Sequence, residues 1–192
     1  MGNVNYAPET LKNDKNPRSS VIKDFLALIK IGIINSNMIT AFAGMWLALF
    51  YNGMLSHFFA YLDKIIFGLA GVFFVIAGSA TLNDYLDRDI DYMMGRTKQR
   101  PTVTGRFSPG FTLTIGISFL VIGSIFLFQA SLTAGFIGLF GAFAYIVLYT
   151  LWSKRRFTLN TVIGSFSGAV PPLIGWACID SDLHVVAWVL FL

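Results

Sequence analysis

Long apolar runs constrain this chain more than any other feature. Five of them, each about 20 residues long, cover residues 31–51, 65–82, 111–128, 132–151 and 159–178, and a sixth begins near residue 184. A helix of about 20 residues is long enough to cross the hydrocarbon core of a membrane. Only 12% of the residues are charged, about half the share of a soluble domain. We therefore expect an all-α, multi-pass bundle of transmembrane helices.

The positive charges are distributed unevenly around these runs. Five lie before the first run, five between the second and third, and three between the fourth and fifth, whereas Lys64 lies alone on the other side. Positively charged loops stay in the cytoplasm. We expect residues 1–30 to form a cytoplasmic polar tail with an amphipathic approach, and residues 31–192 to form the membrane domain. The membrane would be a bacterial plasma membrane or, in a eukaryote, the inner mitochondrial membrane.

An acidic stretch, residues 83–91, follows the second run directly. Asn83, Asp87 and Asp91 are four residues apart, so on a helix they form a stripe along one face, with Asp84 beside it. Carboxylate and amide oxygens suit a hard cation such as Mg²⁺, which commonly binds substrate phosphates as well. We expect these four residues to ligate Mg²⁺, and the three of the stripe to be catalytic. A solvated helix end, with its acids balanced by neighbouring arginines, is the ordinary alternative.

Six polar residues near the expected cytoplasmic face are candidates for binding a diphosphate. They are Arg96, Lys98, Arg100, Lys154, Arg155 and Asn37. The first three follow the acidic stripe in a loop whose cations suit phosphate oxygens. The next two could instead serve only to orient the chain, and the asparagine amide could instead pair with another helix.

The motifs resemble those of a known family. The pattern Asn-x-x-x-Asp-x-x-x-Asp, followed by Arg96-Thr97 and Arg100-Pro101, is similar to the first aspartate-rich motif of the UbiA superfamily of intramembrane prenyltransferases. Residues 168–176, Gly-Ala-Val-Pro-Pro-Leu-Ile-Gly-Trp, resemble the haem-farnesylating branch of that superfamily. The likeness extends over residues 30–176, which is most of the chain.

This resemblance implies an activity and its partners. The chain would be a Mg²⁺-dependent enzyme that transfers a farnesyl group from farnesyl diphosphate to a vinyl group of haem B, giving haem O for terminal oxidases. The lipid bilayer, both substrates and haem A synthase would be its partners, and no nucleic acid is expected. An aromatic quinone precursor as the acceptor, and a cation transporter with carboxylates along its path, are the alternatives.

The family pattern continues beyond these motifs. It includes more helices and a second acidic motif, whereas this sequence stops inside its sixth apolar run. We therefore expect an amino-terminal piece whose bundle is incomplete at the carboxy terminus. Such a piece should enter a membrane but catalyse nothing alone, because the family holds its diphosphate between two acidic motifs.

Overall fold

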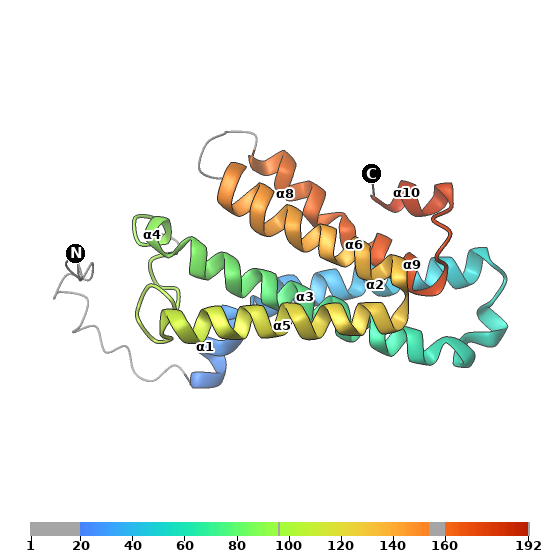
Figure 1. Ribbon diagram of the computed structural model, residues 1–192, viewed down its shortest axis with the longest axis horizontal. Coiled ribbons are helices and arrows are strands. Elements are labelled where there is room, and N and C mark those ends of the chain that lie inside the picture. The colour runs from blue at the N-terminus through green and yellow to red at the C-terminus, as the bar shows by residue number, and fades with distance from the viewer. Residues whose placement is uncertain (1–19, 96, 154–159, 192) are drawn as a thin grey trace.

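Every regular element is a helix in the part of the chain that the computed structural model describes, residues 20–95, 97–153 and 160–191. The long helices run side by side along the longest axis of the molecule (Figure 1). The elements, in chain order, are α1 (Val21–Leu28), α2 (Ile31–Tyr51), the 3₁₀ helix η2 (Leu55–Tyr61), α3 (Leu62–Leu86), α4 (Arg88–Asp91), α5 (Pro109–Ala130), α6 (Leu132–Phe143), the π-helical η3 (Ala144–Ser153), α8 (Asn160–Gly168), α9 (Val170–Ile179) and α10 (Val185–Phe191). The all-α fold class predicted from the apolar runs is confirmed.

Four helical stretches are long and apolar enough to cross a membrane. They are Ile31–Tyr51, Leu55–Leu86, Pro109–Ala130 and Leu132–Ser153. Each of them contains one of the first four predicted runs. Because α3 continues to Leu86, beyond the predicted end of its run, Asn83 and Asp84 belong to its last turn.

The fifth apolar run contains two helices, with the interruption that Pro171 and Pro172 predict. Helix α8 ends at Gly168, and α9 begins at Val170. Pro171 and Pro172 lie in the first turn of α9, where a missing backbone N–H group leaves no helical hydrogen bond unmade. The prolines therefore start a second helix at this point.

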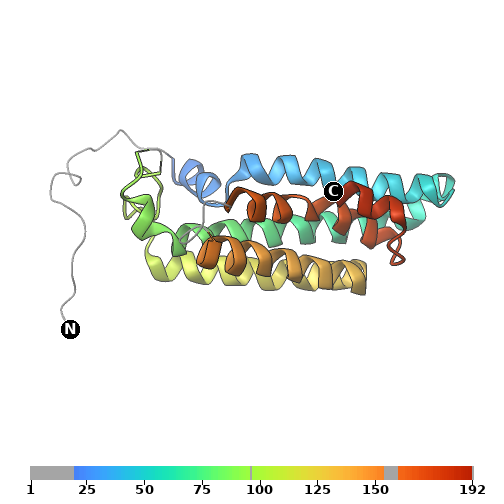
Figure 2. The same cartoon turned by 90° about the horizontal axis from the view of Figure 1, so that it is seen from above.

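Close contacts between backbones hold pairs of helices together in the bundle. Helix α3 packs most extensively against α5, and α2 against α9, as Figure 2 shows from above. A Cβ atom at Gly175 would collide with the Ala41 carbonyl oxygen, and one at Gly44 would collide with the Pro172 carbonyl oxygen. Small residues at such positions let two helices approach closely within a membrane. The glycines therefore determine how near α9 lies to α2.

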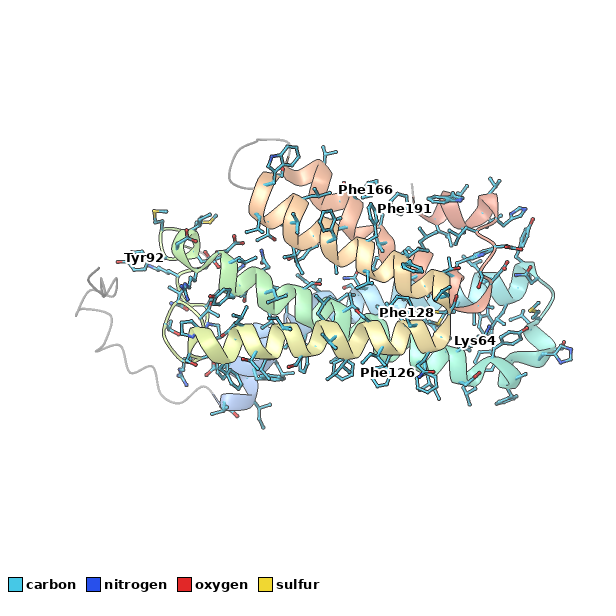
Figure 3. The ribbon with its side chains drawn as sticks, in the orientation of Figure 1. Lys64, Tyr92, Phe126, Phe128, Phe166 and Phe191 are labelled. Atoms are coloured by element: carbon cyan, nitrogen blue, oxygen red, sulfur yellow. The ribbon has the colours of Figure 1, made fainter. Side chains whose placement is uncertain are left out.

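The two ends of the bundle differ in character. Tyr92 and Lys64 lie near opposite ends (Figure 3). At the Lys64 end, a hydrogen bond of 3.0 Å joins the Tyr51 hydroxyl to His184 Nε2, and the His184 and Tyr51 rings are in contact. The acidic stretch, residues 83–91, lies at the Tyr92 end, together with the elbow between α1 and α2, which consists of Ile29 and Lys30.

Candidate active site

The predicted acidic stripe is buried. Asn83, Asp84, Asp87 and Asp91 are 3%, 1%, 0% and 0% exposed, whereas Asp89 is exposed. Helix α3 ends before Asp87, yet the Asp87 backbone N–H donates to the Asn83 carbonyl at 2.9 Å and the Asp91 N–H donates to the Asp87 carbonyl at 2.8 Å. These bonds carry the helical spacing across the junction of α3 and α4. The stripe is therefore one continuous face, held away from water.

The Asn83 amide, at one end of the stripe, makes three hydrogen bonds. Its Nδ2 donates to Asp87 Oδ2 at 2.7 Å and to Thr150 Oγ1 of η3 at 3.1 Å. Its Oδ1 accepts a hydrogen bond from Lys30 Nζ at 2.7 Å. Both amide protons and the amide oxygen are therefore engaged, which fixes the orientation of this side chain.

Lys30 supplies one countercharge for the buried acids. It lies at the elbow between α1 and α2 in a left-handed conformation, with φ 57° and ψ 54°, and its Nζ is 2.9 Å from Asp84 Oδ1. Burial lowers the pKa of Lys30 from its ordinary value, and the Asp84 charge opposes that shift. Lys30 is one of the five positive residues before the first apolar run, and the charge pattern gave it a role only in orienting the chain. Lys30 could have been found from the fact that buried carboxylates need a positive partner, which another segment of the chain must then supply.

Arg100 supplies a second countercharge. Its guanidinium lies 2.9 Å from Asp84 Oδ1 and also contacts Asp91 Oδ2, so one side chain bridges two acids. The Thr97 hydroxyl donates to the Asp91 carbonyl at 3.1 Å and holds the loop against α4. The loop thus returns the Arg100 side chain to the stripe that precedes it in the sequence.

The donor set of the stripe is of the kind that Mg²⁺ prefers. It offers carboxylate and amide oxygens, and Asp91 Oδ1 is buried without a hydrogen-bond partner in the described part of the chain. The described residues contain no group of three or more His, Cys, Asp or Glu side chains that could hold a metal ion as they lie. Lys30 and Arg100 lie against the same oxygens instead. The role of Asn83, Asp84, Asp87 and Asp91 as metal ligands stays a prediction.

A cavity of about 530 Å³ adjoins the stripe. The residues that line it are Ala27, Lys30, Ile33, Asn83, Asp84, Asp91, Met94, Thr97, Gln99, Arg100, Pro101, Tyr145 and Tyr149. The Tyr145 and Tyr149 rings stack at a centroid distance of 5.5 Å, on the π-helical turn of η3. Sequence reasoning missed this pair, although its spacing places both rings on one helix face at the same end of the bundle as the acids.

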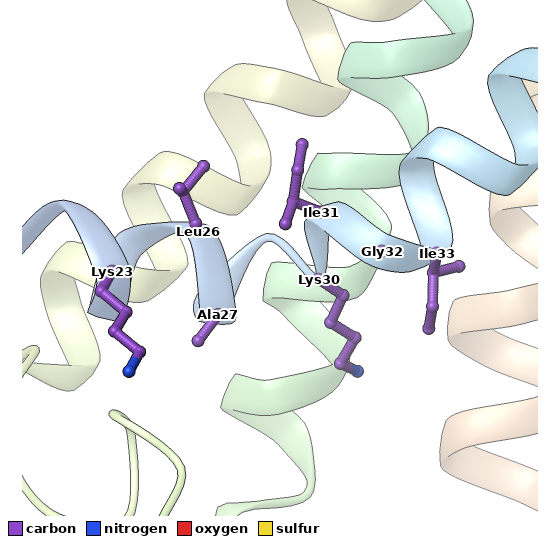
Figure 4. Close-up of a pocket in the computed structure, with 7 residues that line it drawn as sticks. All are labelled: Lys23, Leu26, Ala27, Lys30, Ile31, Gly32 and Ile33. Carbon is purple, nitrogen blue, oxygen red and sulfur yellow. The ribbon is translucent and has the colours of Figure 1, made fainter.

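A second hollow, of about 420 Å³, lies on the elbow itself (Figure 4). Its lining runs from Lys23 along α1 to Ile33 at the start of α2, and Lys23 and Lys30 point to the same side. Ala27, Lys30 and Ile33 line both cavities. The Lys30 side chain therefore lies between the elbow hollow and the acidic cavity.

The other predicted diphosphate ligands are less directly connected to this site. Lys98 is exposed and does not line the acidic cavity. Asn37 is half-buried, and its Nδ2 donates to the Ile33 carbonyl of its own helix at 2.8 Å. Arg96, Lys154 and Arg155 lie outside the described residues. Of the predicted diphosphate ligands in the described part, the structure brings only Arg100 to the acids.

Comparison with known proteins identifies the family. A model of the UbiA prenyltransferase family matches residues 37–192, and the chain belongs to this family. The resemblance drawn from the acidic motif is thereby confirmed, as is the membrane character of the protein.

Curated relatives share more than half of the aligned residues. The chain is 54% identical over 188 residues to protoheme IX farnesyltransferase 1 of Lysinibacillus sphaericus (strain C3-41), which covers 98% of this chain and 58% of that protein. It is 57% identical over 169 residues to the protoheme IX farnesyltransferase of Alkalihalophilus pseudofirmus. This alignment covers 88% of this chain and 54% of that protein. For that of Bacillus cereus (strain G9842), the identity is 54% over 194 residues, covering 98% and 62%. The chain thus spans between 54% and 62% of the length of these relatives.

Solved structures share the fold. A structure of digeranylgeranylglyceryl phosphate synthase matches with a TM-score of 0.72 at 20% identity, over 88% of this chain and 57% of that one. A UbiA homologue from Archaeoglobus fulgidus, bound to GPP and Mg²⁺, matches with a TM-score of 0.66 at 18% identity, over 88% and 58%. The helical bundle described above is therefore a UbiA-like fold.

Proposed function

We propose that this chain acts in the transfer of a farnesyl group from farnesyl diphosphate to a vinyl group of haem B, which gives haem O. The observation that carries the proposal is the buried acidic stripe beside a cavity of about 530 Å³, with Lys30 and Arg100 against its carboxylates. The names of relatives at 54% and 57% identity support farnesyl as the donor group and haem as the acceptor.

The stripe residues would hold the metal and the donor. Asn83, Asp87 and Asp91, with Asp84 beside them, would ligate Mg²⁺. Mg²⁺, when bound, supplies positive charge that stabilises a leaving diphosphate. Arg100 would donate to the diphosphate oxygens, together with the remaining predicted ligands Arg96, Lys98, Lys154, Arg155 and Asn37.

The reaction begins at the allylic C–O bond of the donor. As this bond breaks, its electron pair leaves with the diphosphate, and the Arg100 guanidinium stabilises the charge that grows there. The vinyl group of haem B then attacks the allylic cation, and water adds to the resulting cation with loss of a proton, leaving a hydroxyethylfarnesyl group. Tyr145, Tyr149 and the surrounding helices would keep water from the allylic cation before the acceptor reaches it.

We also propose an orientation in the membrane. The amino terminus and the loop between α4 and α5 would face the cytoplasm, because positive residues concentrate there. The curated relatives are bacterial, which supports the plasma membrane as the location. Haem A synthase would then be the partner that consumes the product.

The test uses the chain alone and also the chain continued with the carboxy-terminal residues of the relative from Bacillus cereus, here called the extended protein. Membranes that contain the extended protein should form haem O from farnesyl diphosphate and haem B when Mg²⁺ is present. The chain alone should insert without turnover. An Asp87→Asn variant of the extended protein should lose the activity, because it removes a carboxylate from the stripe while keeping its shape.

Asp89→Asn is the matched control. Asp89 lies two residues from Asp87 but is exposed, so the same chemical change there should leave haem O formation near the unmodified rate. Equal activity of Asp87→Asn and Asp89→Asn would contradict the role of the stripe. Prenylation of 4-hydroxybenzoate with no reaction of haem B would overturn the proposed acceptor and favour a quinone precursor.

A further inference from the structure

We propose that Lys30 is an internal countercharge for the stripe in the absence of metal, and that it competes with a divalent cation for Asn83 and Asp84. This inference rests on the metal-binding role of the stripe proposed above. It adds Lys30, from the elbow between α1 and α2, which is not among the metal ligands proposed above.

The contacts of Lys30 are made with the oxygens that a metal would need. Its Nζ lies 2.7 Å from Asn83 Oδ1 and 2.9 Å from Asp84 Oδ1. Asn83 Nδ2 already donates to Asp87, so Oδ1 is the atom of this amide through which it could ligate a cation. While Lys30 is in place, that oxygen accepts a hydrogen bond from an ammonium group. Lys30 therefore occupies the position of a cation at this end of the stripe.

Charge makes the two occupants mutually exclusive. Buried carboxylates are costly without positive partners, and Lys30 and Arg100 both contact Asp84. A divalent ion at the same oxygens would lie close to the Lys30 ammonium, and like charges at such separations repel strongly where water is excluded. Metal binding therefore requires the ammonium to withdraw.

The structure offers the ammonium a route of withdrawal. Lys30 lines the elbow hollow of about 420 Å³ as well as the acidic cavity, so its flexible side chain can turn from one toward the other. Turning the side chain requires no movement of α1, which an ion pair of 2.9 Å between the Arg106 guanidinium and Asp24 Oδ2 ties to the loop before α5.

The backbone of Lys30 is itself unusual. Among the described residues other than glycine, Lys30 alone has a positive φ, and such a conformation persists only where the surroundings hold it. Backbone bonds do so here: the Lys30 N–H donates to the Ala27 carbonyl at 3.2 Å, and the Lys30 carbonyl accepts from the Ile33 N–H at 2.8 Å. The elbow can therefore keep this conformation when the side chain turns away.

The first experiment measures the affinity of the extended protein for Mn²⁺, which replaces Mg²⁺ as the probe. The protein is held in nanodiscs of neutral lipid. Lys30→Met should bind Mn²⁺ about tenfold more tightly than the unmodified protein, because a competing charge is gone. Lys30→Arg, which keeps the charge, should bind it with near-unmodified affinity. Lys23→Met is the matched control, since it removes the same charge from α1 without touching the stripe, and it should change the affinity less than about twofold.

The sign of this effect separates the proposal from simple damage. A variant that loosens the fold would bind metal more weakly, whereas loss of a competitor makes binding tighter. Unchanged or weaker binding by Lys30→Met would overturn the proposal. If neither the unmodified protein nor Lys30→Met binds Mn²⁺, the metal-binding role of the stripe fails, and the proposed function fails with it. Equal binding by both proteins would remove only the role given to Lys30.

The second experiment needs no substitution. A small amine-acylating reagent should label Lys30 weakly in the metal-free protein, because Asn83 and Asp84 hold the ammonium, and several-fold more when Mn²⁺ saturates the stripe. Lys98, which is exposed, reports the activity of the reagent in the same sample. Labelling of Lys30 that stays constant while Mn²⁺ binds would overturn the proposal.

Discussion

Asn83 and Asp87 lie one helical turn apart and are joined by a hydrogen bond of 2.7 Å from Asn83 Nδ2 to Asp87 Oδ2. The same amide also contacts Thr150 of η3 and Lys30 of the elbow. One side chain on α3 therefore links Asp87, at the junction of α3 and α4, to two other segments of the bundle. This network holds the polar end of the bundle together.

Replacing Asp91 by Asn should abolish prenyl transfer while leaving membrane insertion intact. The change removes a buried carboxylate from the stripe and one of the two acids that Arg100 bridges. We expect turnover of the extended protein to fall at least about 100-fold, the size of loss typical when a transition-state charge partner is removed. Haem O formation, normalised to the amount of protein in the membrane, measures this. Turnover near the unmodified rate would remove Asp91 from the site.

Replacing Arg100 by Gln should weaken donor binding more than acceptor binding. Because Arg100 lines the acidic cavity, the Kd for farnesyl diphosphate should rise about tenfold, in line with the loss of a charge-assisted hydrogen bond. Arg88→Gln is the matched control, since Arg88 is an exposed cation of α4 that does not line that cavity, and its Kd for farnesyl diphosphate should stay near the unmodified value. Titration of each variant with farnesyl diphosphate and with haem B checks the expectation. If Arg100→Gln instead impairs haem binding alone, the loop holds haem propionates and not the diphosphate.

Replacing Gly175 by Ala should destabilise the packing of α9 on α2. The new Cβ would collide with the Ala41 carbonyl, and a backbone atom cannot rotate out of the way. Overpacking of this kind costs about 1–3 kcal/mol. Gly168→Ala is the control, because no atom lies within 4 Å of a Cβ built there. Thermal unfolding in detergent should show a lower Tm for the first variant alone, and equal Tm values would contradict the described packing.

Single cysteines should report opposite sides of the membrane. In a Cys178→Ser background, Lys98→Cys should react with an impermeant thiol reagent only from the cytoplasmic side. Phe59→Cys, at a side chain that is 84% exposed near the other end of the bundle, should react only from the opposite side. Labelling of Lys98→Cys from outside alone would invert the proposed orientation.

Much of the fold followed from the apolar pattern. A backbone inside lipid must satisfy its hydrogen bonds internally, so a run of about 20 apolar residues has helix as its only open-chain solution. The four-residue spacing of Asn83, Asp87 and Asp91 predicted a shared face, because the geometry of a helix is local and places such residues on one side. The break between α8 and α9 was less accessible, because prolines indicate that a helix is interrupted without indicating where the next one starts.

The countercharges at the stripe were decided by the tertiary structure alone. Lys30 and Asn83 are 53 residues apart in the chain, and their contact depends on how α1, α2 and α3 pack. Arg100 and Lys98 are cations of one short loop, yet only Arg100 turns back to the acids, because the path of the loop decides which side chain faces inward. Local sequence therefore determined the helices and the acidic stripe. Long-range packing decides which cations contact the stripe, and the spacing of residues along the chain does not predict that packing.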